Sequence, residues 1–302
     1  PLSTVVEWLG LGGYGTTDTV TRVTSLAARV SRRPRRRMAA ASDYVSQVWQ
    51  RREFAWYLAM GNLKARNAST TLGLLWWVLN PVLLGAVYWF VFGLLFHRGS
   101  SNFGTPFLVF LLSGMFPFYF TQSALTGGVN SIVGNAMMVA NLRFPRTVLP
   151  FSALLEGFVG FLTSLLAFFL IVGPIYGVLP TAATLWLLPT LVVHFVFNLG
   201  LSLVVARLAV PFRDLNNLVP YLTRIWLYLS PILYGQDIID NAPDAARRIA
   251  NANPLVPLLR LYRFSLGGIP TDVSDALVAS GIWAVTVFSV GSFFFIKHEG
   301  KM

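Results

Sequence analysis

Apolar stretches long enough to cross a lipid bilayer recur along most of this 302-residue chain. A transmembrane helix needs roughly 20 predominantly apolar residues to cross the hydrocarbon core. Six stretches reach or approach that length, and the fifth is the weakest because it is short and contains Arg224. They lie at about 72–96, 106–126, 148–173, 183–209, 217–235 and 276–296. The sequence therefore predicts an all-α membrane protein with six transmembrane helices.

The composition agrees with lipid as the surrounding solvent. Charged residues make up only 12% of the chain, whereas soluble domains carry about 25%. Cysteine is absent and the three histidines, His97, His194 and His298, are far apart. We therefore expect no disulfide, no cysteine nucleophile and no metal site. The net charge of +11 is better explained by membrane topology than by nucleic acid binding, since basic residues mark the cytoplasmic side.

The distribution of basic residues predicts the orientation. If the N-terminus lies inside, most lysines and arginines fall on the same side as both termini. Reversing the topology would place every short basic connection on the wrong side. We expect a multi-pass protein of the cytoplasmic (inner or plasma) membrane with both termini in the cytoplasm.

Four regions differ from one another in composition. Residues 1–42 form a basic, polar stretch that we expect to be a disordered cytoplasmic tail. Residues 43–66 predict an amphipathic helix that lies in the membrane interface or packs on the protein itself. Residues 67–296 form the six-span domain, and a short tail follows at 297–302. The long outer loop of the six-span domain, 236–275, contains apolar patches, which favour short re-entrant helices or a small helical cap.

Catalytic chemistry is not evident in the chain. Lysine occurs only at Lys64, Lys297 and Lys301, and none belongs to a Gly-Lys-Ser/Thr phosphate-binding sequence. No Ser-His-Asp order, paired carboxylates or metal-ligand cluster shares a loop. We therefore expect no catalytic residue and no enzyme in this chain alone. If ATP drives it, a partner must bind the ATP and magnesium.

Three ionisable residues lie within the predicted spans and are functional candidates, because a charge in the bilayer is costly. They are Glu156, His194 and Arg224. Three scattered groups make a poor proton relay. An ion pair between Glu156 and Arg224 on neighbouring helices is a hypothesis; the alternative places both near an aqueous edge.

Aromatic residues make up 14% of the chain and gather in the first, second and fifth stretches. They could form interface belts and lipid-facing bulk, or line a channel whose rings stack on sugar faces. The candidates for a channel lining are Trp76, Trp77, Tyr88, Trp89, Phe118, Tyr119, Trp226, Tyr228 and Tyr234.

Four stretches together resemble one family. They are Arg52-Glu53-Phe54 with Leu63-Lys64-Ala65-Arg66 and the run from Leu72 to Pro81; Phe144-Pro145-Arg146; Phe212-Arg213-Asp214-Leu215 with Ser230-Pro231-Ile232-Leu233-Tyr234; and Asn253-Pro254-Leu255 with Tyr262-Arg263 and Gly267-Gly268. In this order they resemble the permease subunits of polysaccharide-exporting ABC transporters, the Wzm/TagG-like group. The chain departs from the family at Gly61-Asn62 and Arg66-Asn67, where charged or aromatic partners are usual.

The resemblance implies a homodimer around a channel, with two copies of a separate ABC ATPase below it. Segments near 128–146 and the amphipathic helix would receive the ATPase motion. The expected coupling residues are Asn135, Asn141, Arg143, Phe144, Arg146, Arg213 and Asp214. The implied cargo is a polyprenyl-diphosphate-linked glycan such as an O-antigen, a teichoic acid or a galactan, with membrane lipids around it and no nucleic acid.

Cationic side chains suit the diphosphate of such a cargo, since arginine binds phosphate oxygens in a bidentate manner. The candidates near the inner face are Arg51, Arg52, Lys64 and Arg66, which could otherwise serve only to fix topology. Two other functions remain open: an ATP-independent carrier or flippase for lipid-linked sugars, and a membrane glycosyltransferase. An Arg/Ala/Val-rich composition without cysteine is compatible with an actinobacterial galactan exporter.

Overall fold

The computed structural model describes most of the chain beyond the N-terminal region. The described residues are 46, 48–67, 76–88, 90–91, 106–142, 144–235, 241, 243–244, 247–248 and 252–298. The structure discussed below belongs to one compact unit, Val48–Met302. The predicted tails, 1–42 and most of 297–302, lie outside the described residues.

Throughout the described part of the chain, the regular secondary structure is helical and contains no strand. Four of these helices are long and apolar enough to cross a membrane. They are α6 (Phe107–Val133), α8 (Val148–Ala167) with η3 (Phe168–Val172) and α9 (Gly173–Tyr176), α10 (Leu187–Ala209) with η4 (Ala182–Trp186), and α15 (Val273–His298). The predicted all-α membrane class is confirmed, and four predicted spans coincide with these helices.

The other two predicted spans correspond to shorter helices. The helix α5 (Trp76–Tyr88) has 13 residues and α11 (Leu215–Leu229) has 15. At 1.5 Å per residue they are roughly 20 and 22 Å long, less than the ~30 Å hydrocarbon core. Whether these segments also cross the membrane stays a prediction.

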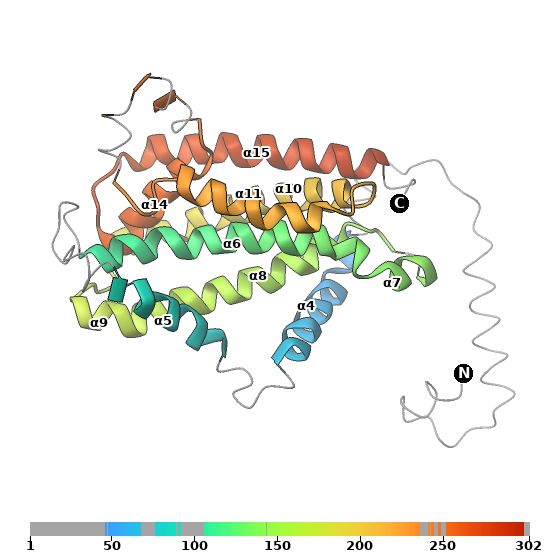
Figure 1. Ribbon diagram of the computed structural model, residues 1–302, viewed down its shortest axis with the longest axis horizontal. Helices are drawn as coiled ribbons and strands as arrows, with labels where there is room; N and C mark the ends of the chain where they lie inside the picture. Colours follow the sequence, from blue (N-terminus) through green and yellow to red (C-terminus); the bar gives the residue numbers. More distant parts are fainter. Residues whose placement is uncertain are drawn as a thin grey trace, which may run out of the picture. The chain divides into compact units, whose positions relative to one another are not determined.

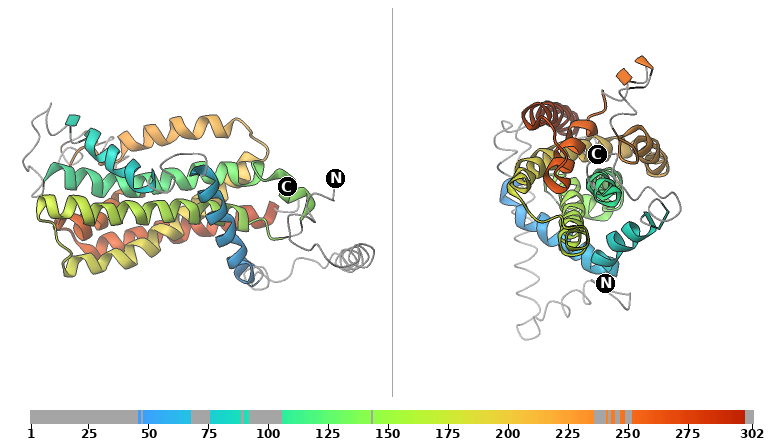
Figure 2. Two further views of the ribbon diagram at one scale, coloured as in Figure 1. Left: turned by 90° about the horizontal axis from the view of Figure 1, so that it is seen from below. Right: turned by 90° about the vertical axis from the view of Figure 1, so that its left-hand side faces the viewer.

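The helix α6 lies in the middle of the described helices (Figures 1 and 2). It packs against α5, α8, α10, α11 and α14, and most of its residues are buried. A small residue permits the contact between α6 and α10. A Cβ added at Gly128 would lie 2.7 Å from a Val205 side-chain carbon and 2.8 Å from the Ser202 carbonyl oxygen. Small residues allow membrane helices to approach closely.

A second close contact joins α10 and α15. A Cβ added at Gly200 would lie 2.6 Å from the backbone of Phe288, and one at Gly291 would clash with the Gly200 carbonyl oxygen. The two backbones therefore touch without intervening side chains. This contact fixes the last long helix on the bundle.

The predicted amphipathic helix is present as α4 (Arg52–Asn67), inclined to α8 (Figure 1). Ala55, Ala59 and Leu63 are buried at a spacing of four residues, and α4 packs on α8. Tyr57 is exposed on the opposite side of the helix, and Trp56 is exposed at the edge of the buried face. One face thus packs on the protein, and the rest of the helix presents amphipathic aromatic side chains. Its position in the membrane interface stays a prediction.

Two short helices complete the described part. The helix α7 (Ala136–Asn141) follows α6, and α14 (Leu255–Gly267) lies within the predicted outer loop. With 13 residues, α14 is too short to span a bilayer, and it packs against α6, α10 and α15. It ends at Gly268, whose left-handed backbone (φ 66°) closes the last turn. A buried helix packed on the spans fits both expectations for this loop, so the re-entrant topology stays a prediction.

Candidate functional site

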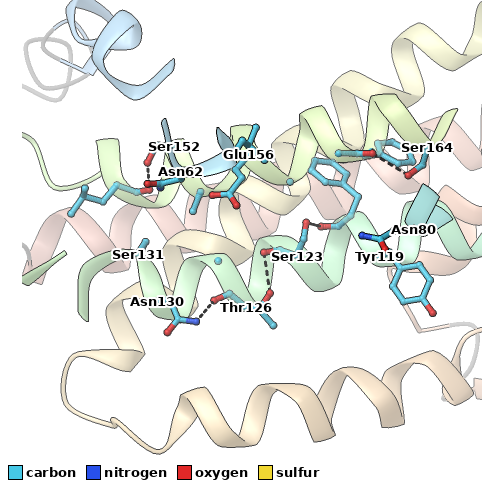
Figure 3. A pocket seen from close by; sticks show the side chains of 18 of the residues that line it. Asn62, Asn80, Tyr119, Ser123, Thr126, Asn130, Ser131, Ser152, Glu156 and Ser164 are labelled. Carbon is cyan, nitrogen blue, oxygen red and sulfur yellow. Dashed lines mark hydrogen bonds between the residues drawn. The ribbon is translucent and has the colours of Figure 1, made fainter. Parts of the chain in front are cut away.

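A polar cavity of about 650 Å³ lies between α6 and α8, with residues of α4 and α5 at its edge (Figure 3). Hydroxyl and amide side chains make up about half of its wall. The polar lining residues are Asn62, Asn80, Tyr119, Ser123, Thr126, Asn130, Ser131, Asn135, Ser152, Glu156 and Ser164. A polar hollow of this kind is unusual inside otherwise apolar helices, where polar groups are expensive.

The α6 wall presents polar side chains at helical spacing, which places them on one face. The Ser123 hydroxyl donates to the Phe120 carbonyl oxygen at 2.9 Å, and the Thr126 hydroxyl donates to Gln122 O at 3.0 Å. The Asn130 amide donates to Thr126 O at 3.0 Å. Since these protons are used by the helix backbone, the side-chain oxygens are left as hydrogen-bond acceptors facing the cavity.

The α8 wall repeats polar or small residues every fourth position, at Ser152, Glu156, Gly160 and Ser164. A Cβ at Gly160 would meet nothing within 4 Å, so the cavity is widened there. Glu156 points into the cavity from this wall (Figure 3). Among the described residues of the lining it is the only aspartate, glutamate, lysine, arginine or histidine.

This arrangement suits a hydroxyl-rich ligand. Hydroxyl and carboxylate oxygens accept hydrogen bonds, and asparagine amides both donate and accept them. The aromatic rings of Phe116, Tyr119, Phe120 and Phe161 add apolar surface to the same wall. The described part of the wall therefore offers both hydrogen-bonding groups and apolar surface to a ligand.

Of the aromatic channel candidates, Tyr119 alone lines this cavity within the described residues. Phe118 is buried in the core, Tyr88 and Trp76 are half-buried on α5, and Tyr228 is exposed on α11. Two candidates, the Trp77 side chain and Trp89, lie outside the described parts.

The last two aromatic candidates form hydrogen bonds. Trp226 bonds to Asn253, and the Tyr234 hydroxyl donates to Tyr228 O at 3.1 Å. A channel lining by the full aromatic set stays a prediction.

The predicted headgroup cations lie on or beside α4. Arg51, Arg52 and Lys64 are exposed, and the Arg66 side chain lies outside the described residues. The Arg52 guanidinium lies 5.2 Å from the centre of the Trp49 ring and donates to Trp49 O at 3.2 Å. Of the described candidates, Arg51, Arg52 and Lys64 are not among the residues that line the polar cavity.

Part of the predicted coupling surface is brought together around α4. The rings of Phe54 on α4 and Phe144 before α8 meet edge to face, with centroids 5.8 Å apart. The remaining members lie at helix ends. Asn135 lines the polar cavity, Asn141 is exposed at the end of α7, Arg146 is half-buried, Arg213 and Asp214 are exposed before α11, and Arg143 is outside the described residues.

The three intramembrane ionisable residues have different surroundings. Glu156 lines the cavity, whereas Arg224 is exposed on α11. His194 is fully buried, with Nε2 2.8 Å from the Thr121 hydroxyl and Nδ1 3.0 Å from the Tyr262 hydroxyl. It thereby links α6, α10 and α14. The hypothesised Glu156–Arg224 pair stays a prediction, and the described residues contain no group of three or more potential metal ligands.

Two of the family-like stretches meet where α11 ends and α14 begins. The Asn253 side chain accepts from the Trp226 indole at 2.9 Å and donates to the Ser230 hydroxyl at 2.8 Å. The buried Arg263 guanidinium donates to the carbonyl oxygen of Pro231 and lies 3.7 Å from the centre of the Phe110 ring. The Ser-Pro-Ile, Asn-Pro-Leu and Tyr-Arg sequences therefore form one junction.

Sequence reasoning missed the polar wall of the cavity. The signal was present, since Ser123, Thr126 and Asn130 recur at spacings of three and four within an apolar stretch. On α8, Ser152 and Ser164 lie four and eight residues from Glu156 and therefore share its face of the helix. Such a stripe indicates a face turned away from lipid.

Comparisons with known proteins agree on one family. Residues 53–266 match the family model described as ABC-2 type transporter. The chain is 31% identical over 243 residues to the O-antigen export system permease protein RfbA of Klebsiella pneumoniae, covering 79% of this chain and 90% of that protein. It is 30% identical over 258 residues to the protein of that name from Myxococcus xanthus, covering 84% and 96%.

A more distant relative is the polysialic acid transport protein KpsM of Escherichia coli, 25% identical over 227 residues and covering 73% of this chain and 83% of that protein. The resemblance to polysaccharide-export permeases, predicted from four short stretches, is confirmed by these matches.

Proposed function

The chain belongs to the ABC-2 type transporter family, and on that premise we propose that it is the membrane subunit of an ATP-driven exporter that moves a polysaccharide across the cytoplasmic membrane. Curated relatives that match over most of their length are O-antigen export permeases. Such permeases are transport subunits rather than enzymes.

The observation that carries the proposal is the hydroxyl- and amide-lined cavity between α6 and α8. A sugar polymer presents many neutral hydroxyls and apolar ring faces. Side-chain oxygens from Ser123, Thr126 and Ser152 offer acceptors to those hydroxyls, and nearby aromatic rings offer apolar contact. A coupling ion would instead need charged or backbone ligands near the midplane.

The proposal also specifies the membrane topology and the subunit composition of the transporter. The chain crosses the membrane six times, with α5 and α11 lying within the two shorter spans and both termini in the cytoplasm. Two copies surround the channel, and two copies of a separate ATPase bind ATP and magnesium below them. The exposed apolar residues Leu218, Leu222 and Ile225 on α11 are suited to lipid or to a second copy.

The cargo in this proposal is a polyprenyl-diphosphate-linked glycan, of which a galactan is one form. Its diphosphate would stay at the inner interface beside the exposed cations Arg51, Arg52 and Lys64, while sugar units occupy the polar cavity. The outer α14 would act as a re-entrant helix that narrows the path. The contact between Phe54 and Phe144 supports α4 as the element that receives motion from the ATPase.

The test is to express the chain with a candidate ABC ATPase subunit from the same genome and to measure ATP turnover of the purified complex in lipid. We expect no turnover by the chain alone, and turnover by the complex that changes when lipid-linked glycan is added. A chain that forms no complex, or a complex indifferent to glycan, would contradict the proposal and favour an ATP-independent carrier.

A matched pair of variants tests the cavity within that complex. Thr126→Val removes a hydroxyl from the cavity wall, and Thr163→Val removes a hydroxyl that bonds to Val159 O at 2.9 Å outside the lining. We expect Thr126→Val to weaken the glycan effect on turnover several-fold, by about 1 kcal/mol for one hydrogen bond. Thr163→Val should leave it unchanged.

A further inference from the structure

An apolar cavity of about 330 Å³ lies between α5, the first half of α6 and the segment in which α8 passes through η3 into α9. Its lining residues are Val82, Gly85, Ala86, Leu108, Leu112, Phe116, Ala167, Phe168, Ile171, Val172, Ile175 and Tyr176. Among these described residues, Tyr176 is the only one with a polar side chain. An apolar cavity of about 150 Å³ is large enough to bind benzene, so this one has room for a longer hydrocarbon.

The cavity is elongated along the helices. On α6 its lining residues are Leu108, Leu112 and Phe116, and on α5 they include Val82 and Ala86. A spacing of four residues places side chains on one face of a helix, one above the other. From Leu108 to Phe116, α6 rises roughly 12 Å at 1.5 Å per residue. This length covers most of one leaflet, which is half of the ~30 Å hydrocarbon core.

One end of the cavity lies where the helices end. Leu108 is the second residue of α6, and Tyr176 is the last residue of α9. The start of α6 and the end of α9 lie at the same end of the described helices (Figure 1). Tyrosine is enriched at membrane–water interfaces, because its ring is apolar and its hydroxyl is polar. Tyr176 therefore marks the interfacial end of the cavity, and Phe116 marks its deep end.

The cavity is continuous with the apolar outer surface of the span formed by α8, η3 and α9. Ile171 and Ile175 line the cavity and are 37% and 69% exposed. Leu166 and Leu170 are exposed on the same span outside the lining. Lipid tails are as apolar as leucine, so a spanning helix with this surface is surrounded by hydrocarbon. The medium at the mouth of the cavity is therefore lipid chain rather than water.

We propose that this cavity binds one acyl chain of a bilayer phospholipid, with the glycerol end beside Tyr176 and the chain end beside Phe116. The chain would add apolar contact between α5 and the bundle, where Gly85 already approaches Leu112: a Cβ added at Gly85 would lie 3.5 Å from its methyl carbons. The inference rests on the membrane location and goes beyond the proposed export function, because this lipid stays with the protein and is not the cargo.

The binding test uses the full chain, purified and stripped of lipid in a steroid-based detergent, which brings no alkyl chain. The probe is a phosphatidylcholine with a diazirine near the end of one long acyl chain. Native mass spectrometry counts the bound lipid, and peptide analysis after photolysis locates it. We expect one saturable site, with label on α5, on η3 and on α6 between Leu112 and Phe116.

Competition tests the depth of the site. Unlabelled phosphatidylcholine with long acyl chains should displace the probe. Phosphatidylcholine with butyryl chains carries the same headgroup but cannot reach from Tyr176 to Phe116, so it should not displace the probe at the same concentration.

Two neighbouring residues on α5 provide matched variants. Ala86 is exposed within the wall of the cavity, and Val87 is exposed outside it. Ala86→Phe should fill the site and weaken probe binding about tenfold, which corresponds to 1.4 kcal/mol. Val87→Phe adds the same ring outside the lining and should leave binding unchanged. On the opposite wall, Ile171→Trp inside the lining and Leu170→Trp outside it repeat the comparison.

Several results would overturn the proposal. Label spread over the outer surface without saturation, equal effects within both pairs of variants, or equal competition by the butyryl lipid would each contradict it. Stronger competition by a polyprenyl phosphate than by long-chain phosphatidylcholine would assign the cavity to the tail of a cargo lipid instead. A folded protein that binds no probe would show that the cavity takes no lipid chain.

Discussion

The indole nitrogen of Trp226 on α11 donates a 2.9 Å hydrogen bond to the side-chain oxygen of Asn253, which precedes α14. The same oxygen accepts the Leu255 backbone N–H at 3.0 Å, and the Asn253 amide donates to the Ser230 hydroxyl at 2.8 Å. One side chain therefore satisfies three polar groups at the point where two helices meet.

Replacing Asn253 with alanine should destabilise the protein by about 2 kcal/mol, because the buried groups at this junction lose their partners. The measurement is thermal unfolding of the purified protein in micelles. Asn217→Ala is the control, since Asn217 is exposed on α11. Equal melting temperatures for the two variants would show that the junction contributes nothing to stability.

The contact between His194 and Tyr262 should be energetically coupled. Both side chains are fully buried and their hydrogen bond is 3.0 Å long. Tyr262→Phe and His194→Phe should each lower stability, and the double variant should lose about 0.6 kcal/mol less than the sum, the average for hydrogen bonds between membrane helices. Unfolding titrations with a denaturing detergent measure this double-mutant cycle.

The exposed Tyr221 provides the control for that cycle. Tyr221→Phe should leave stability unchanged and show no coupling to His194→Phe. Strict additivity between His194→Phe and Tyr262→Phe would mean that the hydrogen bond between α10 and α14 has no net energetic value.

The close contact of α10 with α15 should be intolerant of a single methyl group at Gly200. The added Cβ would lie 2.6 Å from the Phe288 backbone, and overpacking of this kind costs about 1–3 kcal/mol. Gly281→Ala on α15 is the matched control, because its Cβ would meet nothing within 4 Å and alanine favours helix. Gly200→Ala should lower the melting temperature and Gly281→Ala should not; parallel losses would argue against steric contact as the cause.

The start of α15 should respond to acid through Asp272. Hydrogen bonds from the Ser274 hydroxyl and the Asp275 backbone N–H lower the pKa of the Asp272 carboxyl. The folded state therefore favours the ionised form. The stabilising effect is present above the ordinary aspartate pKa of ~3.9 and is lost as the pH falls through the lowered value.

A spin label can report this change, since the chain has no cysteine of its own. With a labelled cysteine in place of the exposed Val278, label mobility should rise at acidic pH as the first turn of α15 loosens. Asp272→Asn should remove that pH dependence. Identical acid responses in the two proteins would assign the effect to other groups.

The lengths of the apolar stretches were enough to predict the four long helices, because the thickness of a bilayer imposes them. Helix spacing also predicted α4, whose small residues Ala55 and Ala59 pack on α8. The predicted stretch 217–235 extends beyond α11, which ends at Leu229, because the sequence stays apolar past the end of the helix. The apolar residues that follow pack against the protein without continuing the helix.

The polar cavity and the helix junction could not be predicted in the same way. Periodicity places Ser152 and Glu156 on one face of a helix, but the neighbour that this face meets is a property of the assembled bundle. The bond from Trp226 on α11 to Asn253 before α14 joins residues that are 27 positions apart in the chain. The resemblance to a family singled out Asn253 beforehand, whereas Trp226 was named only as an aromatic channel candidate.

Export itself provides the most direct test of the account. In the native host, the chain would be depleted and polysaccharide measured separately at the cell surface and as lipid-linked glycan inside the cell. The account predicts that surface polysaccharide falls while lipid-linked glycan accumulates inside, and that only a chain able to bind the ATPase restores export. Unchanged surface polysaccharide with no internal accumulation would contradict it.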